Sequence, residues 1–243
     1  MLRDCRTAER PDAVLFSAVR VWLGPVAALA ALTVVVLGVL YAGDSGPGAV
    51  DARIGAAVDG TGPRWRQAAP AMDFLGEPLG AAMLVAAAVT GCMALRRPRA
   101  AVLFVAGTGL GVVATKLLKP VVARTIHGEN LSFPSGHTAF LTAFVLVLAL
   151  VVAGRLGLGG PAGAALVLAA ALLAGGAMGW AQVFLGAHYP TDTLGGFCTA
   201  LALVPATAWL VDRTADRRAE RKAGRNADRP TESKADAGRP QGR

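Results

Sequence analysis

Long stretches without Asp, Glu, Lys or Arg dominate this chain of 243 residues. A helix that crosses a bilayer needs about 20 consecutive apolar residues, and charges at membrane depth are costly. The longest stretch holds one span between two turns, because GLGGP opens it and GAHYPT closes it. Six transmembrane helices are therefore predicted, with approximate ranges 21–43, 78–95, 100–118, 130–154, 162–185 and 193–211.

The composition supports a membrane protein and argues against other classes. Hydrophobic residues make up 54% of the chain and charged residues 16%, whereas a soluble domain carries about 25% charge. The three cysteines, Cys5, Cys92 and Cys198, are scattered and form no disulfide framework or CxxC metal motif. The net charge of +8 comes from basic residues at the ends of apolar stretches, without interleaved aromatics, so nucleic-acid binding is not indicated.

The distribution of Lys and Arg predicts the orientation. With both termini in the cytoplasm, 18 of the 24 basic residues lie inside, as the positive-inside rule requires. The first helix is expected to remain uncleaved, since it has no evident cleavage site. The predicted fold is thus an all-α integral membrane protein, a bundle of six transmembrane helices. Its parts are a cytoplasmic segment (1–20), the membrane domain (21–212) and a disordered, basic cytoplasmic tail (213–243) that attracts anionic headgroups.

Unusual polar residues gather in the connections expected at the outer face. The three outer connections are roughly 44–70, 116–136 and 186–191, and the last two carry nearly all of these residues. Four helix ends would thereby bring cations, histidines and a carboxylate to one membrane depth. The residues concerned are Lys116, Lys119, Arg124, Ser135, Gly136, His137, His188 and Asp192.

The outer cations and the motif FPSGH point together to a phosphate. Any one of the cations alone could simply cap a helix C-terminus or reach toward lipid headgroups. However, FPSGH opens a helix, so the backbone N–H groups of Ser135, Gly136 and His137 should point outward and unpaired. Such an N-terminus is an anion site, and nearby cations strengthen it.

The two outer histidines supply acid–base and nucleophilic chemistry. Pro190 disfavours helix just before it, so His188 is expected in a turn and Asp192 in the first turn of the next helix. The carboxylate can accept the proton of one imidazole nitrogen and leave the other as a nucleophile. His137 could then protonate the leaving oxygen. No metal-ligand spacing is evident, so no metal and no cofactor are expected.

These residues resemble the type 2 phosphatidic acid phosphatase (PAP2) superfamily of integral membrane lipid phosphatases. Its signature reads Lys-x6-Arg-Pro, Pro-Ser-Gly-His and Ser-Arg-x5-His-x3-Asp. The second part is intact at 134–137, and the third retains His188 and Asp192. The resemblance covers roughly residues 70–205. It implies a metal-independent phosphatase with a phosphohistidine on His188, His137 as the acid, and phosphate held by Ser135, Gly136, Lys119 and Arg124.

Two departures from the signature reduce the positive charge of the predicted site. In KPVVARTI, Arg124 matches an extra Arg of many relatives, and Ile126 occupies the usual Arg position; Lys119 fits the Lys position better than Lys116. In the third part, Ala181 and Gln182 replace Ser-Arg. Gln182 should lie about 9 Å below His188 if the helix continues at 1.5 Å per residue. It is expected to bind the phosphate through at most one neutral hydrogen bond, and only if the last turns bend toward the pocket.

The leading hypothesis is therefore an outward-facing phosphatase of the bacterial-type cytoplasmic membrane. Lipid phosphates and polyprenyl diphosphates are the candidate substrates, with membrane lipids as surroundings. A catalytically weakened, lipid-phosphate-binding relative or a transport protein is the alternative. A transporter should carry its ionisable groups near the bilayer midplane, whereas this cluster lies at one surface. The oligomeric state and the substrate stay open.

Overall fold

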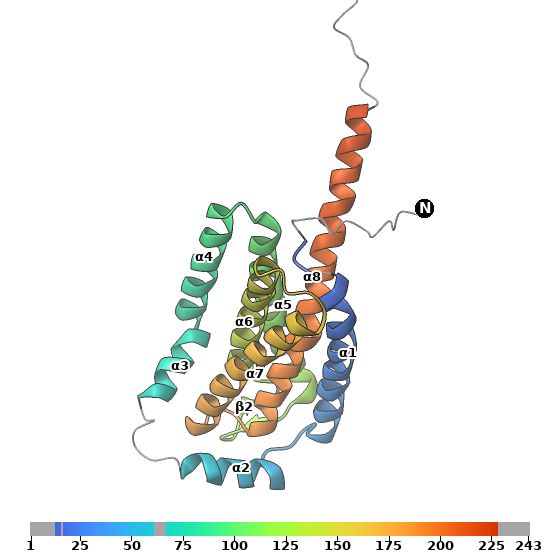
Figure 1. Cartoon of the computed structure of the whole chain (residues 1–243). Helices are drawn as coiled ribbons and strands as arrows, with labels where there is room; N and C mark the ends of the chain where they lie inside the picture. Colours follow the sequence, from blue (N-terminus) through green and yellow to red (C-terminus); the bar gives the residue numbers. More distant parts are fainter. Residues whose placement is uncertain (1–12, 16, 61–66, 228–243) are drawn as a thin grey trace, which may run out of the picture.

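The computed structural model is an all-α bundle with one small hairpin (Figure 1). It describes residues 13–15, 17–60 and 67–227, so the predicted N-terminal segment and the end of the predicted tail lie mostly outside the described residues. The elements are α1 (Ser17–Leu40), α2 (Ala49–Asp59), α3 (Ala68–Gly76), α4 (Pro78–Ala94), α5 (Pro98–Val122), β1 (Thr125–Ile126), β2 (Asn130–Leu131), α6 (Gly136–Arg155), α7 (Gly160–Phe184) and α8 (Pro190–Ala227).

Proline and glycine set the boundaries of these helices. Helices α4, α5 and α8 begin at a proline, whose missing N–H would have no intrahelical partner at that position. Helix α7 ends at Phe184, and Gly186 just beyond its C-cap has a φ of 68°. The N–H of Gly186 donates to the Val183 carbonyl, and the N–H of Ala187 donates to the Gln182 carbonyl. This pattern is a Schellman motif, which reverses the chain just before His188.

Helix α6 forms the centre of the bundle. It contacts α5, α7 and α8, and it is the most buried of the candidate membrane spans. Small residues let its N-terminal end pack against α8. A Cβ on Gly195 would overlap the Phe133 ring, and a Cβ on Gly196 would overlap the Ser135 carbonyl. The sequence DTLGG therefore brings the start of α8 against the FPSG segment.

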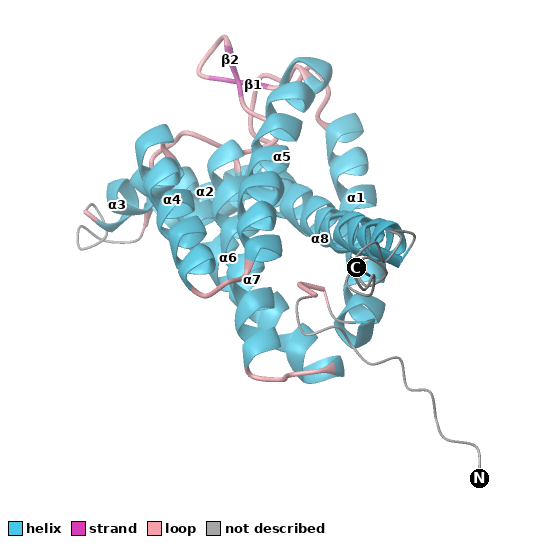
Figure 2. Ribbon diagram, turned by 90° about the horizontal axis from the view of Figure 1, so that it is seen from above, coloured by secondary structure: helices cyan, strands magenta, loops and turns pink. Residues whose placement is uncertain are grey.

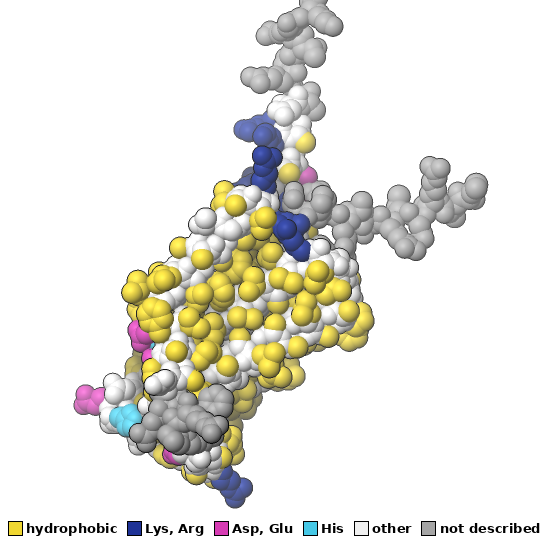
Figure 3. All heavy atoms as spheres, turned by 60° about the vertical axis from the view of Figure 1, so that its left-hand side comes forward, with side chains coloured by type: hydrophobic (Ala, Val, Ile, Leu, Met, Phe, Trp, Pro, Cys, Tyr) yellow, Lys and Arg dark blue, Asp and Glu magenta, His cyan; other side chains and the backbone are white. Residues whose placement is uncertain are grey.

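The helices fit a membrane in number, length and surface. Five of them are long and apolar enough to span a bilayer, and the count is six if the pair α3–α4, bent by 67°, is one broken span. This agrees with the predicted all-α membrane bundle, whose second span corresponds to α4. In the most apolar window of α1 only 17% of residues are buried inside the protein, so most of this helix surface requires lipid. Figure 3 shows the resulting hydrophobic surface, with Lys and Arg side chains concentrated toward the end from which α8 extends.

The predicted tail is helical over most of its described part. Helix α8 continues to Ala227, so the expectation of disorder from 213 onward is wrong for residues 213–227; residues 228–243 lie outside the described residues. The composition alone did not reveal this helix, because extending an existing transmembrane helix avoids the unfavourable nucleation step of helix formation. The extension is also rich in Ala, Arg, Lys and Glu, which favour helix. Arg99 Nη2 contacts Asp216 Oδ1 at 2.9 Å and ties the extension to α5.

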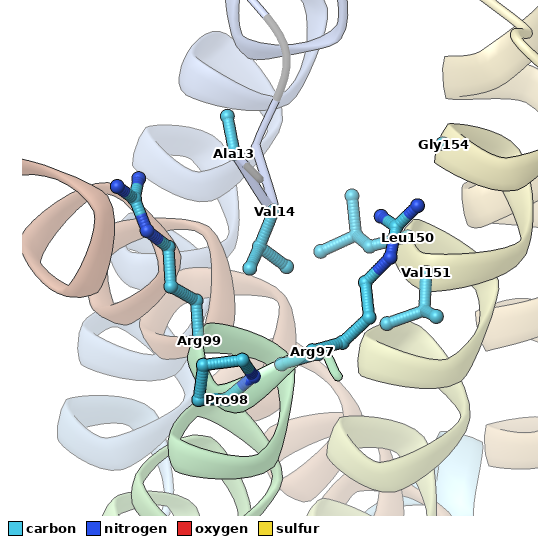
Figure 4. A pocket seen from close by; sticks show the side chains of 9 residues that line it. Ala13, Val14, Arg97, Pro98, Arg99, Leu150, Val151 and Gly154 are labelled. Atoms are coloured by element: carbon cyan, nitrogen blue, oxygen red, sulfur yellow. The ribbon is translucent and has the colours of Figure 1, made fainter. Parts of the chain in front are cut away.

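The end of the bundle with α8's extension also holds the first described residues. The N–H groups of Val14 and Leu15 donate to the Asp212 carboxylate, at 3.1 and 2.9 Å. A small pocket beside them is lined by Val14, by Arg97 of the α4–α5 turn and by Arg99 in the first turn of α5 (Figure 4). This pocket contains none of the predicted site residues.

Helix α2 and the hairpin β1–β2 lie at the opposite end (Figure 1). Neither was predicted, because both fall within the outer connections. Helix α2 runs across the bundle end and contacts α7 and α8. The hairpin follows α5 directly and pairs Thr125 with Leu131 (Figure 2). The site residues and the two described chain ends are thus separated by the length of the bundle.

This separation leads to a topology prediction. Because most basic residues lie at the end opposite the hairpin, a reporter inserted after Gly128 should report the outer side of the membrane. A reporter at the C-terminus should report the cytoplasm. Paired alkaline phosphatase and green fluorescent protein fusions measure both positions. The reverse pattern would contradict the outward-facing site.

Candidate active site

The predicted site residues meet at the ends of four helices, on the side of the bundle that carries the hairpin. Lys119 lies in the last turn of α5, His137 in the first turn of α6 and Gln182 in the last turn of α7. His188 lies in the turn before α8, and Asp192 lies in the first turn of α8, as predicted. Chain segments more than 60 residues apart in the sequence therefore converge at this end.

His188 is buried and faces Asp192. Its side chain is 9% exposed, and Nδ1 lies 3.8 Å from Asp192 Oδ2 without a hydrogen-bond partner. Burial lowers the pKa of His188; the nearby Asp192 carboxylate opposes this shift, and the charges of Lys119 and His137 add to it. The imidazole is therefore neutral at neutral pH. With Nδ1 turned to the carboxylate, Nε2 is the nitrogen available as a nucleophile.

Asp192 is fully buried, and its two oxygens have different partners. Oδ2 accepts a hydrogen bond from the backbone N–H of Tyr189 at 3.0 Å and faces His188. Oδ1 accepts from Arg124 Nη1 at 2.7 Å. The Asp192 backbone carbonyl accepts from the N–H of Ser135 at 2.9 Å. The carboxylate is thereby fixed on both sides, which restricts the orientation of the neighbouring imidazole.

His137 lies between two carboxylates that sequence analysis missed. Its Nε2 is 3.5 Å from Asp73 Oδ1 and 3.4 Å from Glu77 Oε1, and it has no hydrogen-bond partner. Both carboxylates flank the bend between α3 and α4. Gly76 makes the approach possible, since a Cβ there would overlap the His137 ring. No motif links these residues to His137, because they are about 60 positions away.

Asp73, Glu77 and His137 also have the spacing of metal ligands. One ligand atom from each lies within 4.8 Å of the other two. The expectation that no metal-ligand arrangement exists came from local sequence spacing, and this group is assembled only by the fold. The same geometry suits a protonated imidazole between two carboxylates, which needs no ion.

Gln182 differs from its predicted position. The estimate of 9 Å assumed a straight helix, but the reversal at Gly186 brings the backbone N–H of His188 to 3.3 Å from the Gln182 carbonyl. The side chain is buried, and Nε2 donates to Asp73 Oδ1 at 2.6 Å. Gln182 therefore lies at the site, and its amide is committed to a carboxylate.

The two lysines of α5 have different environments. Lys119 is partly buried, and its Nζ donates to the Leu131 carbonyl at 2.7 Å. Its charge contributes to the lowered pKa of His188, so it lies within electrostatic reach of that imidazole. Lys116 is exposed. The structure thus favours Lys119 as the cation of the site.

Ser135 and Gly136 open α6 as expected, with one difference. Ser135 is the N-cap, and its hydroxyl oxygen accepts from the Thr138 N–H at 3.4 Å. The expectation of an unpaired N–H at Ser135 is wrong, since that group donates to the Asp192 carbonyl. The N–H groups of Gly136 and His137 begin the helix, where no intrahelical acceptor exists. The predicted anion site at the start of α6 would therefore consist of these two amides.

Arg124 is fully buried in an ion-pair network. Its Nη2 pairs with Asp51 Oδ2 and its Nη1 with Asp192 Oδ1, each at 2.7 Å. Nη1 also donates to the Thr191 hydroxyl, and the rings of Tyr41 and Tyr189 lie over the guanidinium at 4.1 and 4.5 Å. The prediction that Arg124 holds phosphate stays untested, and its contacts favour a different task. Sequence analysis missed Asp51, which no motif marks.

Comparison with known proteins identifies the family. A model of the PAP2 superfamily matches residues 78–216, which is more than half of the chain. The chain belongs to the PAP2 superfamily. The crystal structure described as the first transmembrane PAP2 type phosphatidylglycerolphosphate phosphatase from Bacillus subtilis has the same fold, with a TM-score of 0.62. The two chains are 23% identical over 79% of this chain and 96% of the other. No curated protein sequence matches the chain.

Membership of the PAP2 superfamily gives the two departures a structural context. Ile126, at the usual Arg position, is buried in the hairpin. Gln182, at the second Arg position, is held by Asp73. This PAP2 member therefore has an amide and an aliphatic side chain where the signature has two guanidinium groups. The resulting site carries less positive charge.

The Gln182→Arg variant is expected to bind vanadate about tenfold more tightly than the wild type. A guanidinium adds a charge-assisted hydrogen bond to the oxyanion, and Asp73 lies within reach as its partner, so the added cation is not buried alone. The matched variant Gln182→Ala should change kcat/KM by no more than about threefold, since the hydrogen bond that is lost runs to the partly exposed Asp73 carboxylate, which water can solvate instead. Inhibition constants for vanadate measure the first effect. Loss of activity in Gln182→Arg would instead indicate a site adapted to a less charged substrate.

Proposed function

We propose that this chain is a phosphatase that hydrolyses a lipid phosphate or isoprenoid diphosphate at the outer face of the cytoplasmic membrane. The observation that carries the proposal is the buried His188, neutral and turned through Nδ1 toward the buried Asp192. His137 and Lys119 are close enough for their charges to act on it. This arrangement supplies a nucleophile, an acid and a phosphate-binding cation in a chain of the PAP2 superfamily.

The reaction follows from these positions. His188 Nε2 attacks phosphorus, and the bond from phosphorus to the leaving oxygen breaks as His137 gives that oxygen its proton. The N–H groups at the start of α6 and the Lys119 ammonium stabilise the charge on the phosphoryl oxygens. His137, now neutral, takes a proton from water, whose oxygen attacks the phosphohistidine. The phosphorus–nitrogen bond breaks, inorganic phosphate leaves and His188 is restored.

A phosphate-release assay on the detergent-purified protein tests this function. The panel contains phosphatidylglycerophosphate, phosphatidate and undecaprenyl diphosphate; the first is included because of the structural neighbour. Release from at least one lipid is expected, and it should persist in EDTA because cations of the protein and backbone amides hold the phosphate. Activity that disappears with EDTA and returns with a divalent metal would contradict the metal-independent mechanism and point to Asp73, Glu77 and His137.

A lipid-phosphate-binding protein without turnover is the second candidate. It is favoured by the two uncharged residues at the signature's Arg positions, Ile126 and Gln182. The same purified protein distinguishes the two candidates. Saturable binding of vanadate or lipid phosphate without phosphate release from any lipid of the panel would support the binding protein.

Lys119→Ala is expected to lower kcat/KM by about 10- to 100-fold. A charge-assisted contact to phosphate contributes about 1.5–3 kcal/mol. Lys116→Ala is the matched control, since it removes the same charge from the same helix at an exposed position. It should remain within about twofold of the wild type. Equal losses in the two variants would show a general electrostatic effect and not a contact of Lys119 with the substrate.

A further inference from the structure

Asp51 is a buried carboxylate that lies outside the region matched by the family model. It belongs to α2, whereas the match begins at residue 78. Its side chain is fully buried, although the helix crosses the outer end of the bundle and its neighbour Val50 is exposed (Figure 1). A buried carboxylate is costly unless it is paired and hydrogen-bonded. Its partners therefore indicate what it does.

The Asp51 carboxylate joins three segments of the site. Oδ2 accepts from Arg124 Nη2 at 2.7 Å, and Oδ1 accepts from the backbone N–H of Thr191 at 2.9 Å. The Thr191 hydroxyl also donates to Oδ2, at 3.0 Å. Thr191 is the residue before Asp192. Asp51 thus holds both the arginine that pairs with Asp192 and the helical turn that carries Asp192.

We propose that Asp51 and Arg124 are positioning residues, which hold Asp192 and, through it, the nucleophile His188. The inference rests on the proposed function, since it assigns these residues a part in the same reaction. Arg124 then acts as a clamp inside the protein and not as a ligand of the substrate phosphate. Helix α2 therefore contributes to the active site by supplying Asp51.

The charges and geometry support this assignment over phosphate binding. Arg124 is fully buried, lies between two aromatic rings and already donates to two carboxylates and a hydroxyl. Both N–H groups of Nη1 and one N–H group of Nη2 already have partners; Nε has none, but it belongs to the same fully buried side chain. Removal of Asp51 would leave Arg124 with one carboxylate and free the first turn of α8. Misplacement of a reacting group by about 1 Å can cost about 100-fold in rate.

The test compares Asp51→Asn with the matched variant Asp59→Asn. Both change an aspartate of α2 to its amide, but Asp59 is exposed. Asp51→Asn is expected to lower kcat by about 10- to 100-fold, with KM and the vanadate inhibition constant within about threefold of the wild type. Asp59→Asn should match the wild type. Asp51→Glu, which keeps the charge, should recover part of the lost kcat.

The kinetics of the Asp51 variants distinguish a positioning role from phosphate binding by Arg124 and from a general loss of folding. A kcat of Asp51→Asn within twofold of the wild type would overturn the proposal. So would an unchanged kcat with a raised KM and weaker vanadate inhibition, which would make Arg124 a phosphate ligand. If Asp51→Asn does not fold, as judged by size-exclusion chromatography, Asp51→Glu decides: a lowered kcat at unchanged vanadate affinity supports positioning, and wild-type kinetics contradict it.

The same assay keeps this proposal distinct from the proposed function. Wild-type phosphate release, and its loss in His188→Ala, test the phosphatase itself. If the wild type is an active phosphatase and Asp51→Asn has a normal kcat, the positioning role of Asp51 and Arg124 is contradicted, whereas the proposed function stands. If the wild type binds vanadate but releases no phosphate, the proposed phosphatase function is contradicted. In that case an unchanged vanadate affinity in Arg124→Lys would still support Arg124 as a positioning residue. A tenfold weaker affinity would contradict that role.

Discussion

Replacing His188 with alanine is expected to lower kcat by about 10⁴- to 10⁶-fold while vanadate still binds. Removal of a nucleophile eliminates the covalent route, as the loss of the serine nucleophile does in a hydrolase triad. The phosphate-binding amides of α6 and the Lys119 ammonium do not depend on His188, so affinity for an oxyanion should fall by no more than about tenfold. Phosphate release and vanadate protection against thermal unfolding measure the two effects.

His127→Gln is the matched control for this variant. His127 is an exposed histidine of the hairpin, and its Nε2 lies 2.9 Å from the Gly186 carbonyl. Glutamine can keep that hydrogen bond as a donor, so the control should retain most of the wild-type activity. Substantial turnover by His188→Ala would refute the phosphohistidine. An acid-labile phosphate on the wild-type enzyme, absent from the His188→Ala variant, would support it directly.

The sequence predicted those features that depend on local patterns. Uncharged length predicted the six spans, Ser135 and Pro190 marked the starts of α6 and α8, and the spacing of His188 and Asp192 placed both at one helix end. Each of these features is encoded within a few turns of chain, by hydrophobic length, capping or proline. This explains why the spans and the proximity of His188 to Asp192 could be predicted without a structure.

The remaining site residues are set by tertiary contacts. Asp51 and Asp73 lie in or beside the first outer connection, and nothing near them in the sequence indicates that they meet Arg124 and Gln182. The position of Gln182 relative to His188 depended on the φ of one residue, Gly186. Such placements follow from how helices pack and how loops turn, which local periodicity does not record.

The residue at the bend between α3 and α4 that contacts Gln182 also lies beside His137. In the signature an Arg stands at position 182, whereas here an amide donates to Asp73, which also approaches His137. An amide in place of that cation, beside a carboxylate, makes the site less positive. The Asp73 and Glu77 carboxylates both lie beside His137, the predicted acid.

His137→Ala is accordingly expected to show a loss that depends on the leaving group. For lipid phosphates, whose alkoxide leaving group is strongly basic, kcat/KM should fall by about 10²- to 10⁴-fold, the usual contribution of a general acid. For p-nitrophenyl phosphate, whose leaving group needs no proton, the burst of nitrophenol that reports formation of the phosphohistidine should slow by less than about tenfold. Steady-state turnover should still fall, since water attack on the phosphoenzyme also uses His137.

Rapid-mixing measurements of the burst on both wild type and variant separate these steps. Asp73→Asn serves as the comparison, because it alters the surroundings of His137 and keeps the imidazole; it should lose less activity on lipid phosphates than His137→Ala does. Equal losses of burst rate and lipid turnover in His137→Ala would contradict an acid role. They would be expected if His137 chiefly binds phosphate, because binding is lost for every substrate alike, whereas proton transfer matters only where the leaving oxygen is basic.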